Sequence, residues 1–198
     1  MIFEIIKDYW LEALAVIFAI IYLFLVIKQD IRCWYAAIIS SSLYFFVMLS
    51  ANLYMEAYLQ VFYIGMAVYG WNQWKRSNKI ETDFVVKTWS INQHIYTISL
   101  IFIFAFISGR LLENYTNAAL PFIDALTTWG AIIATYMVAK KLIENWIYWF
   151  VIDAISVYLF ASRGLILTSL LFTGYLCMIY VGYKSWSKIR DNNNAKSL

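Results

Sequence analysis

Seven apolar stretches of spanning or near-spanning length alternate with polar connections along this chain. A spanning α-helix needs about 20 mainly apolar residues, because it rises about 1.5 Å per residue through a hydrocarbon core about 30 Å thick. The pattern therefore predicts an all-α membrane protein with seven transmembrane helices. The stretches cover residues 10–27, 34–50, 54–74, 92–109, 120–139, 146–162 and 165–183.

Composition excludes a soluble domain. Of 198 residues, 63% are hydrophobic and only 14% are charged, so a soluble fold would leave much apolar surface in water. The chain is expected to lie in membrane lipid and to have no nucleic-acid partner. No cleavable signal peptide is expected in its first residues, Met1 to Tyr9, which mix acidic and basic side chains.

The basic residues predict the orientation. With seven crossings, twelve of the 15 Lys and Arg fall on one side, and only Lys7, Arg110 and Arg163 fall on the other. Cytoplasmic loops carry the excess of basic residues, so the N-terminus is expected outside and the C-terminus in the cytoplasm. Four tryptophans near segment ends are expected at the headgroup level: Trp10, Trp34, Trp89 and Trp186.

An internal repeat relates the two ends of the chain. A shift of 112 residues without a gap pairs Trp34 with Trp146, Tyr63 with Tyr175, Gly70 with Gly182 and Trp74 with Trp186. The expected plan is a 3+1+3 parallel repeat of three-helix bundles, because three crossings and one linker helix separate the copies. Its parts are a first repeat (1–76), a basic cytoplasmic loop with a linker helix (77–111), and a second repeat with a short polar tail expected to be disordered (112–198). Parallel-repeat transporters place their substrate at the repeat interface near the midplane.

Asp153 is the feature that points to function. It lies inside the apolar stretch 146–162 with no cation within a helical turn. A carboxylate at that depth costs about 2.5–3.5 kcal/mol, so it needs a partner, a watery cavity or a cationic ligand. Trp146, Trp149 and Ser156 share its helical face. A carboxyl that only holds helices together is the competing interpretation.

A binding site for a flat, cationic, hydrogen-bonding solute fits these residues, since aromatic faces attract cations and a carboxylate supplies the counter-charge. In the repeat register, Ser41 lies opposite Asp153, so one half offers hydroxyls and the other a carboxylate. The third helix adds amide and aromatic side chains, among them Gln60, Tyr63, Tyr69, Trp71 and Trp74. Packing is the alternative role for each aromatic.

Other chemistries are poorly supported. His94 is the only histidine, and with two distant cysteines it forms no plausible zinc or haem set; no cofactor is expected. The glycines form no phosphate-binding loop. Glu12, Asp124 and Glu56 lie near outer helix ends, where a solvated or snorkelling role is expected, although proton or sodium coupling through them or Asp153 stays open.

Several segments resemble the Pnu family of bacterial vitamin transporters, which includes transporters of nicotinamide riboside and of thiamine. They are Leu59-Gln60-Val61-Phe62, Val68-Tyr69-Gly70-Trp71 with Trp74, Glu144-Asn145-Trp146 with Trp149, and Ile155-Ser156-Val157. The resemblance covers nearly the whole chain, including the 3+1+3 plan that the family shares with SWEET sugar transporters.

The resemblance implies facilitated diffusion of a vitamin without enzymatic activity, coupled functionally to a cytoplasmic kinase that traps the product. It also implies substrate-binding residues, which are Gln60, Tyr63, Tyr69, Trp71, Asn145, Trp146 and Trp149. Asp153 departs from the nicotinamide riboside pattern, which has an amide there; a carboxylate suits an aminopyrimidine or a thiazolium, so thiamine is slightly favoured over nicotinamide riboside.

Two interpretations compete with vitamin transport. In a membrane receptor or assembly subunit, Asp153 would only fix packing. A SWEET-type sugar transporter follows from the architecture but not from an anionic site. Apolar outer faces occur in monomers and homo-oligomers alike, so a homo-oligomer stays open as well.

Overall fold

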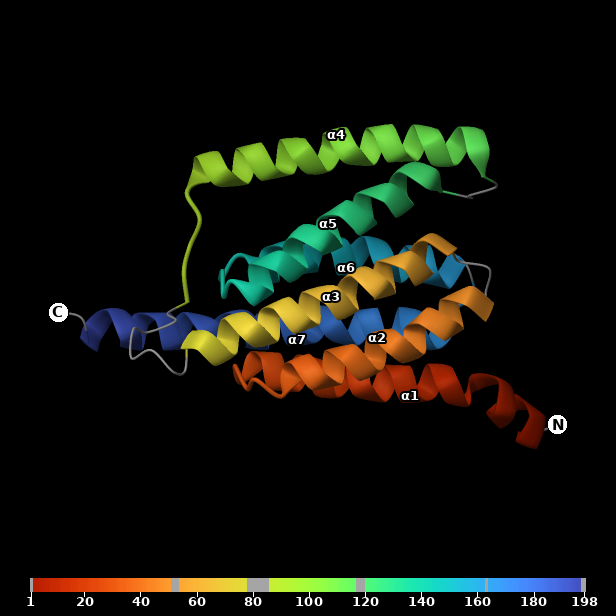
Figure 1. Ribbon diagram of the computed structural model, residues 1–198, viewed down its shortest axis with the longest axis horizontal. Helices are drawn as coiled ribbons and strands as arrows, with labels where there is room; N and C mark the ends of the chain where they lie inside the picture. Colours follow the sequence, from red (N-terminus) through yellow and green to blue (C-terminus); the bar gives the residue numbers. More distant parts are fainter. Residues whose placement is uncertain (1, 51–53, 78–85, 117–119, 163, 197–198) are drawn as a thin grey trace. The chain divides into compact units, whose positions relative to one another are not determined.

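A computed structural model of the chain describes residues 2–50, 54–77, 86–116, 120–162 and 164–196 (Figure 1). Within these residues the fold is all-helical, which confirms the predicted class and the seven helices. The helices are α1 (Ile2–Ile27), α2 (Cys33–Ser50), α3 (Tyr54–Ser77), α4 (Ile91–Tyr115), α5 (Pro121–Ala139), α6 (Asn145–Ser162) and α7 (Ile166–Lys196). Part of the long polar connection, 78–85, lies outside the described residues.

Six of the described helices are long and apolar enough to cross a membrane. The exception is α3, which carries Glu56, Gln60, Asn72 and Gln73 along its length and Lys75 near its end. These polar side chains lower the mean hydropathy of α3, although the helix is long enough to cross a membrane. The chain is thus a multi-pass membrane protein, and the seventh crossing and the orientation stay predictions.

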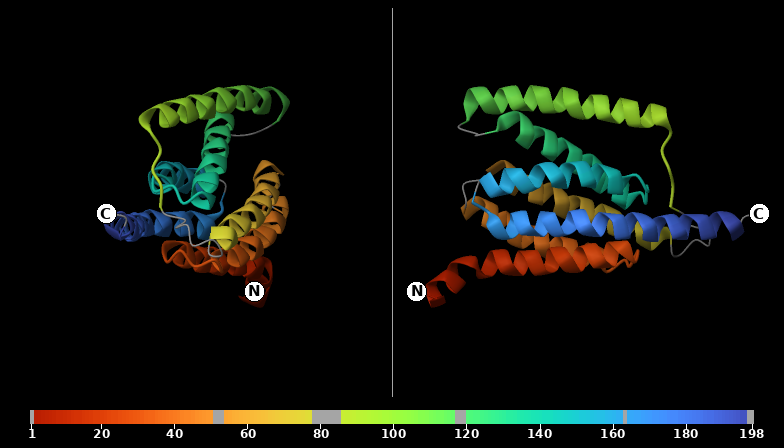
Figure 2. Two further views of the ribbon diagram at one scale, coloured as in Figure 1. Left: turned by 60° about the vertical axis from the view of Figure 1, so that its left-hand side comes forward. Right: turned by 180° about the vertical axis from the view of Figure 1, so that it is seen from behind.

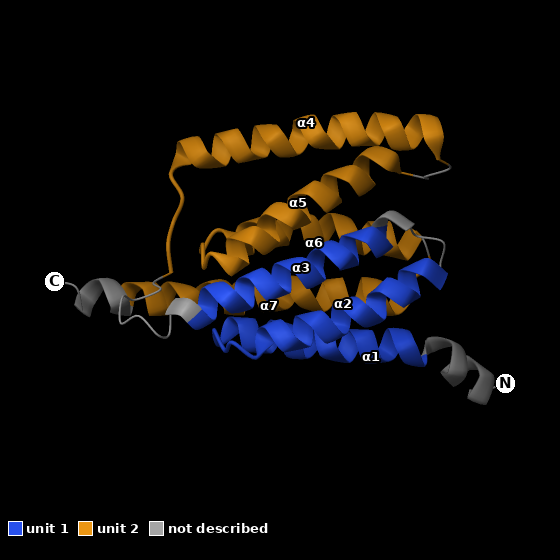
Figure 3. Cartoon of the chain, viewed as in Figure 1, with its two compact units in different colours: residues 1–84 blue, residues 85–198 orange. Residues whose placement is uncertain are grey.

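The chain divides into two compact units, residues 1–84 and 85–198 (Figure 3). In the first unit, α2 packs against both α1 and α3. A buried hydroxyl ties the first pair together, since Ser40 Oγ donates to the carbonyl of Ala15 at 3.0 Å. Because α2 packs against both other helices, it is the central helix of this unit.

In the second unit each helix packs on the next one in sequence, and α5 runs at an angle to α4 in both views of Figure 2. Trp129 of α5 stacks on Phe104 of α4 with ring centroids 4.8 Å apart, and its indole N–H donates to Ser108 Oγ at 3.0 Å. Ser169 Oγ of α7 donates to the carbonyl of Val157 in α6 at 2.9 Å. Here α6 takes the place that α2 has in the first unit.

The helix bounds repeat at the offset seen in the sequence. The first residues of α2 and α6 are 112 positions apart (33 and 145), and so are those of α3 and α7 (54 and 166). The turns that precede α2 and α6 each hold one non-glycine residue with φ 54, Gln29 and Lys141, again 112 positions apart. These coincidences support the predicted repeat.

Paired tryptophans fill the contact between the second and third helix of each repeat. Trp34 meets Trp74 edge to face at 5.3 Å, and Trp146 meets Trp186 at 5.6 Å. All four rings are buried. The expectation that Trp34 and Trp186 lie at the headgroup level is therefore wrong, because each indole packs against a partner indole of its own unit. Trp10 is half exposed, as an interfacial residue would be.

Two smaller expectations are also wrong. Glu12, Glu56 and Asp124 are buried rather than solvated; Asp124 lies in the first turn of α5, where the helix dipole stabilises a carboxylate. The polar tail does not begin as a coil, since α7 continues through Asp191 to Lys196. Asp191 follows the basic residues Lys188 and Arg190, and α7 simply extends past its apolar part.

Candidate functional site

The first residue of α6, Asn145, is held by the turn before it. Lys141 adopts positive φ, which lets the Leu142 amide donate back to the Met137 carbonyl at 2.9 Å. The Leu142 carbonyl then accepts from the Asn145 amide at 3.2 Å and from Asn145 Nδ2 at 2.5 Å. With its nitrogen engaged, the side-chain oxygen of Asn145 is buried and has no hydrogen-bond partner. This oxygen is therefore a buried acceptor that a hydrogen-bond donor of a ligand would satisfy.

Asp153 lies about two turns further along α6, about 12 Å from Asn145 at 1.5 Å per residue. Only 2% of its surface is exposed, and its Oδ1 is buried without a hydrogen-bond partner. Both features agree with the sequence analysis, which found no cation near it. A buried carboxylate without a donor is costly, so the arrangement favours a ligand that brings donors or a positive charge.

The remaining predicted residues of α6 differ in their surroundings. Trp149 is half-buried, whereas Trp146 is buried against Gly182 and Trp186. The indole N–H of Trp146 has no acceptor, yet its ring is fully used in packing. On this helix Asp153, Asn145 and Trp149 are thus better placed to meet a ligand than the ring of Trp146.

In the first unit the predicted residues come from two helices. Ser41 of α2 is buried, and Gln60, Tyr63 and Tyr69 of α3 are half-buried. Trp71 is also half-buried and lies 6.4 Å from the ring of Tyr35, with Lys75 Nζ 4.3 Å from its ring centroid. A lysine therefore already occupies a face of Trp71, and a cationic ligand would have to compete for it.

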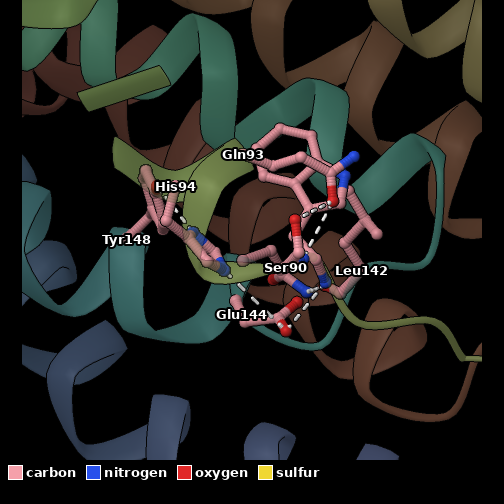
Figure 4. Close-up of polar contacts among 8 residues, drawn as sticks. Ser90, Gln93, His94, Leu142, Glu144 and Tyr148 are labelled. Atoms are coloured by element: carbon pink, nitrogen blue, oxygen red, sulfur yellow. Dashed lines mark hydrogen bonds and ion pairs between the residues drawn. The ribbon is translucent and has the colours of Figure 1, made fainter. Parts of the chain in front are cut away.

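A polar cluster around His94 escaped the sequence analysis, which considered this histidine only as a metal or haem ligand. His94 Nδ1 lies 3.0 Å from the Tyr148 hydroxyl, and His94 Nε2 lies 3.9 Å from Glu144 Oε1 (Figure 4). The same carboxylate oxygen accepts the Trp89 amide at 3.1 Å. Fifty or more residues separate these partners in sequence, so no local spacing could have joined them. The Ser90–Gln93 capping box is readable in the sequence, but it marks only the start of α4.

A protein-family model described as "Nicotinamide mononucleotide transporter" matches residues 9–188. The chain belongs to this family. The match begins within the first third of α1 and ends within α7, so it includes all or part of each of the seven described helices.

Relatives with assigned roles are distant in sequence but match over nearly their full length. The nicotinamide riboside transporter PnuC of Escherichia coli (strain K12) is 23% identical, over 96% of this chain and 90% of that protein. The riboflavin/roseoflavin transporter RibM of Streptomyces davaonensis is 24% identical, over 89% and 84%. The crystal structure of the vitamin B3 transporter PnuC has the same fold, with a TM-score of 0.80, 22% identity, and 96% and 86% of the two chains covered. These relatives are named as transporters of nicotinamide riboside, of riboflavin and roseoflavin, and of vitamin B3.

Proposed function

We propose that this protein carries a cationic vitamin across the bacterial inner membrane, and that nicotinamide riboside is the first candidate. The observation that carries the proposal is the pair of buried acceptors on α6, Asp153 Oδ1 and Asn145 Oδ1, which have no donor in the described structure. Nicotinamide riboside brings a pyridinium charge, a carboxamide N–H₂ and ribose hydroxyls, which complement both acceptors. The relatives named for nicotinamide riboside and vitamin B3 support this choice.

The residues of α6 have separate roles in this proposal: Asp153 neutralises the cation or accepts its hydroxyls, Asn145 orients it, and Trp149 stacks on it. The sequence adds Gln60, Tyr63, Tyr69, Trp71 and Ser41 as further candidates, while the ring of the other predicted residue, Trp146, packs against Trp186. Transport proceeds by alternating access and facilitated diffusion, and cytoplasmic phosphorylation retains the product.

The mononucleotide is a poorer candidate than the riboside, although the family description names it. A phosphate adds about 1.5 to 2 negative charges near neutral pH. A second anion in a site that already holds a buried carboxylate raises the cost of binding. The riboside presents a cation to Asp153 without that penalty.

Thiamine is the second candidate, and Asp153 itself favours it. An aminopyrimidine offers N–H donors to a carboxylate, whereas the amide expected at this position suits a carboxamide. The relatives described above are named for other vitamins, so we place thiamine after nicotinamide riboside.

The test is binding and uptake by purified protein. Tryptophan quenching and uptake into liposomes are compared for nicotinamide riboside, its mononucleotide, thiamine and riboflavin. We expect saturable quenching and uptake above empty vesicles for nicotinamide riboside. A response to thiamine or riboflavin alone would reassign the substrate, and no uptake of any of the four would overturn vitamin transport.

The variant Asp153→Asn separates transport from a packing role. Loss of a charge-assisted hydrogen bond of about 1.5–3 kcal/mol weakens binding roughly 10-fold to 100-fold. The melting temperature is expected to hold or rise, because the variant removes a desolvated charge. A lower melting temperature with unchanged binding would favour the receptor or assembly alternative.

A further inference from the structure

The turn before α6 is fastened by a segment that lies far from it in sequence. The Lys87 amide donates to the Lys141 carbonyl at 3.0 Å, and the Ile143 amide donates to the Lys87 carbonyl at 3.0 Å. Lys87 and Leu142 thus form a parallel bridge. Val86, Leu142 and Ile143 are buried around it, so the bridge is protected from water.

Side chains reinforce the same junction. Glu144 Oε1 accepts the Trp89 amide, and His94 lies between Glu144 and Tyr148 (Figure 4). The Trp89 ring meets the His94 ring edge to face at 5.7 Å. We call this junction the latch; its residues are Lys87, Trp89, His94, Leu142, Glu144 and Tyr148.

The equivalent turn of the first unit is built differently. The position that corresponds to Glu144 is Arg32, which pairs with Asp30 of its own turn at 2.6 Å. Arg32 is exposed, whereas the Glu144 side chain is only 16% exposed. The two turns share their backbone conformation but are stabilised differently. The turn before α2 is held by an ion pair between two of its own residues, whereas the turn before α6 is held by the segment that precedes α4.

We propose that Glu144 and His94 are positioning residues for transport: the latch holds the turn before α6, and through it the buried oxygen of Asn145. This inference rests on the proposed function. Two links connect the latch to Asn145. Glu144 is the residue directly before Asn145, and the Leu142 carbonyl, which accepts a hydrogen bond from the Asn145 side chain, belongs to the residue that bridges to Lys87. A small displacement of a binding group is costly in affinity.

The first test compares two charge-removing variants of the second unit, Glu144→Gln and the control Glu113→Gln. Glu113 forms an exposed ion pair with Arg110 at 2.9 Å, at the other end of α4. We expect Glu144→Gln to weaken vitamin binding and uptake roughly tenfold and Glu113→Gln to leave both unchanged. Equal binding in the two variants would overturn the inference.

A second readout needs no vitamin. Hydrogen exchange at the amides of Lys87, Trp89 and Ile143 reports whether the latch is closed. We expect these amides to be protected in the wild type and to exchange faster in Glu144→Gln and His94→Ala. If the wild-type protein transports no vitamin, the proposed function fails while this exchange still tests the latch; unchanged exchange in both variants overturns the latch itself.

A rescue separates positioning from general instability. Lys87→Cys with Leu142→Cys, in a background without the thiols of Cys33 and Cys177, places two cysteines at the bridge. Combined with Glu144→Gln, the oxidised pair is expected to restore binding, and the reduced pair is not. Equal binding in the oxidised and reduced states would contradict a positioning role.

Discussion

At the residue scale, two glycines allow the tryptophans to pack as they do. A Cβ at Gly182 would lie 2.3 Å from Cη2 of Trp146, and one at Gly70 would lie 2.3 Å from Cζ2 of Trp34. No side chain fits at that distance, so each glycine allows its helix to approach an indole closely. The indoles have no room to retreat, because each is also packed against Trp186 or Trp74.

Gly182→Ala is therefore expected to destabilise the protein by about 1–3 kcal/mol, the usual effect of overpacking. Gly174 of the same helix is the matched control, because nothing lies within 4 Å of its missing Cβ. Gly174→Ala should be neutral or stabilising by up to about 1 kcal/mol, since alanine favours helix. Thermal unfolding in detergent measures both, and equal shifts would contradict the packing argument.

A carboxylate in the α1–α2 turn predicts a pH dependence. Hydrogen bonds from the side chain and backbone of Arg32 lower the pKa of Asp30 below its ordinary value of 3.8. A carboxyl with a lowered pKa contributes stability that is complete above the unfolded pKa and is lost as the pH falls through the folded pKa.

Asp30→Asn is thus expected to lower the melting temperature slightly at pH 7, and the difference from wild type should disappear as the pH falls below about 3.8. The effect is small, because Arg32 is exposed and its charge is screened by solvent. Melting temperatures of both proteins across this pH range measure it. A difference that grows towards low pH would show the opposite sign of linkage.

At the element scale, the two φ-positive turns matter because they set where α2 and α6 begin. Non-glycine residues in the left-handed region lose about 1–2 kcal/mol. Gln29 and Lys141 adopt this conformation despite its cost. The resulting turn directs α2 back along α1, and α6 back along α5. The strain recurs at equivalent positions, which indicates that the turn conformation is a requirement of the hairpin.

Gln29→Gly and Gln29→Ala test this requirement. The glycine variant is expected to be more stable than the alanine variant by about 1 kcal/mol, because glycine enters the left-handed region without a steric penalty. Inside a helix the order is reversed. Equal stability of the two variants, or a more stable alanine variant, would exclude a strained turn at this position.

At the scale of the whole molecule, the orientation in the membrane is the main open prediction. Arg110→Cys and Lys188→Cys, in a background without the native thiols, place single cysteines at opposite expected sides. A membrane-impermeant thiol reagent is expected to label Arg110→Cys in intact cells and Lys188→Cys only after permeabilisation, as the distribution of basic residues implies. The reverse pattern would place the N-terminus in the cytoplasm.

The sequence by itself was enough for the helical class, the seven segments and the repeat offset of 112 residues, because apolar length and rare residues such as Trp and Gly are visible in one dimension. It also singled out Asp153, since an ionisable residue in an apolar stretch is conspicuous. The family resemblance followed from the same local segments, and the family match bears it out.

Only the tertiary structure decided what each side chain touches. The sequence assigned Trp34 and Trp186 to the lipid headgroups, and packing buried them, because position along a helix does not reveal which neighbour covers it. The junction of Glu144, His94 and Lys87 was likewise invisible, since its partners come together only when the segment before α4 returns to the turn before α6. Spacing along a chain determines which face a residue shares; contact between distant segments depends on how the chain folds back on itself.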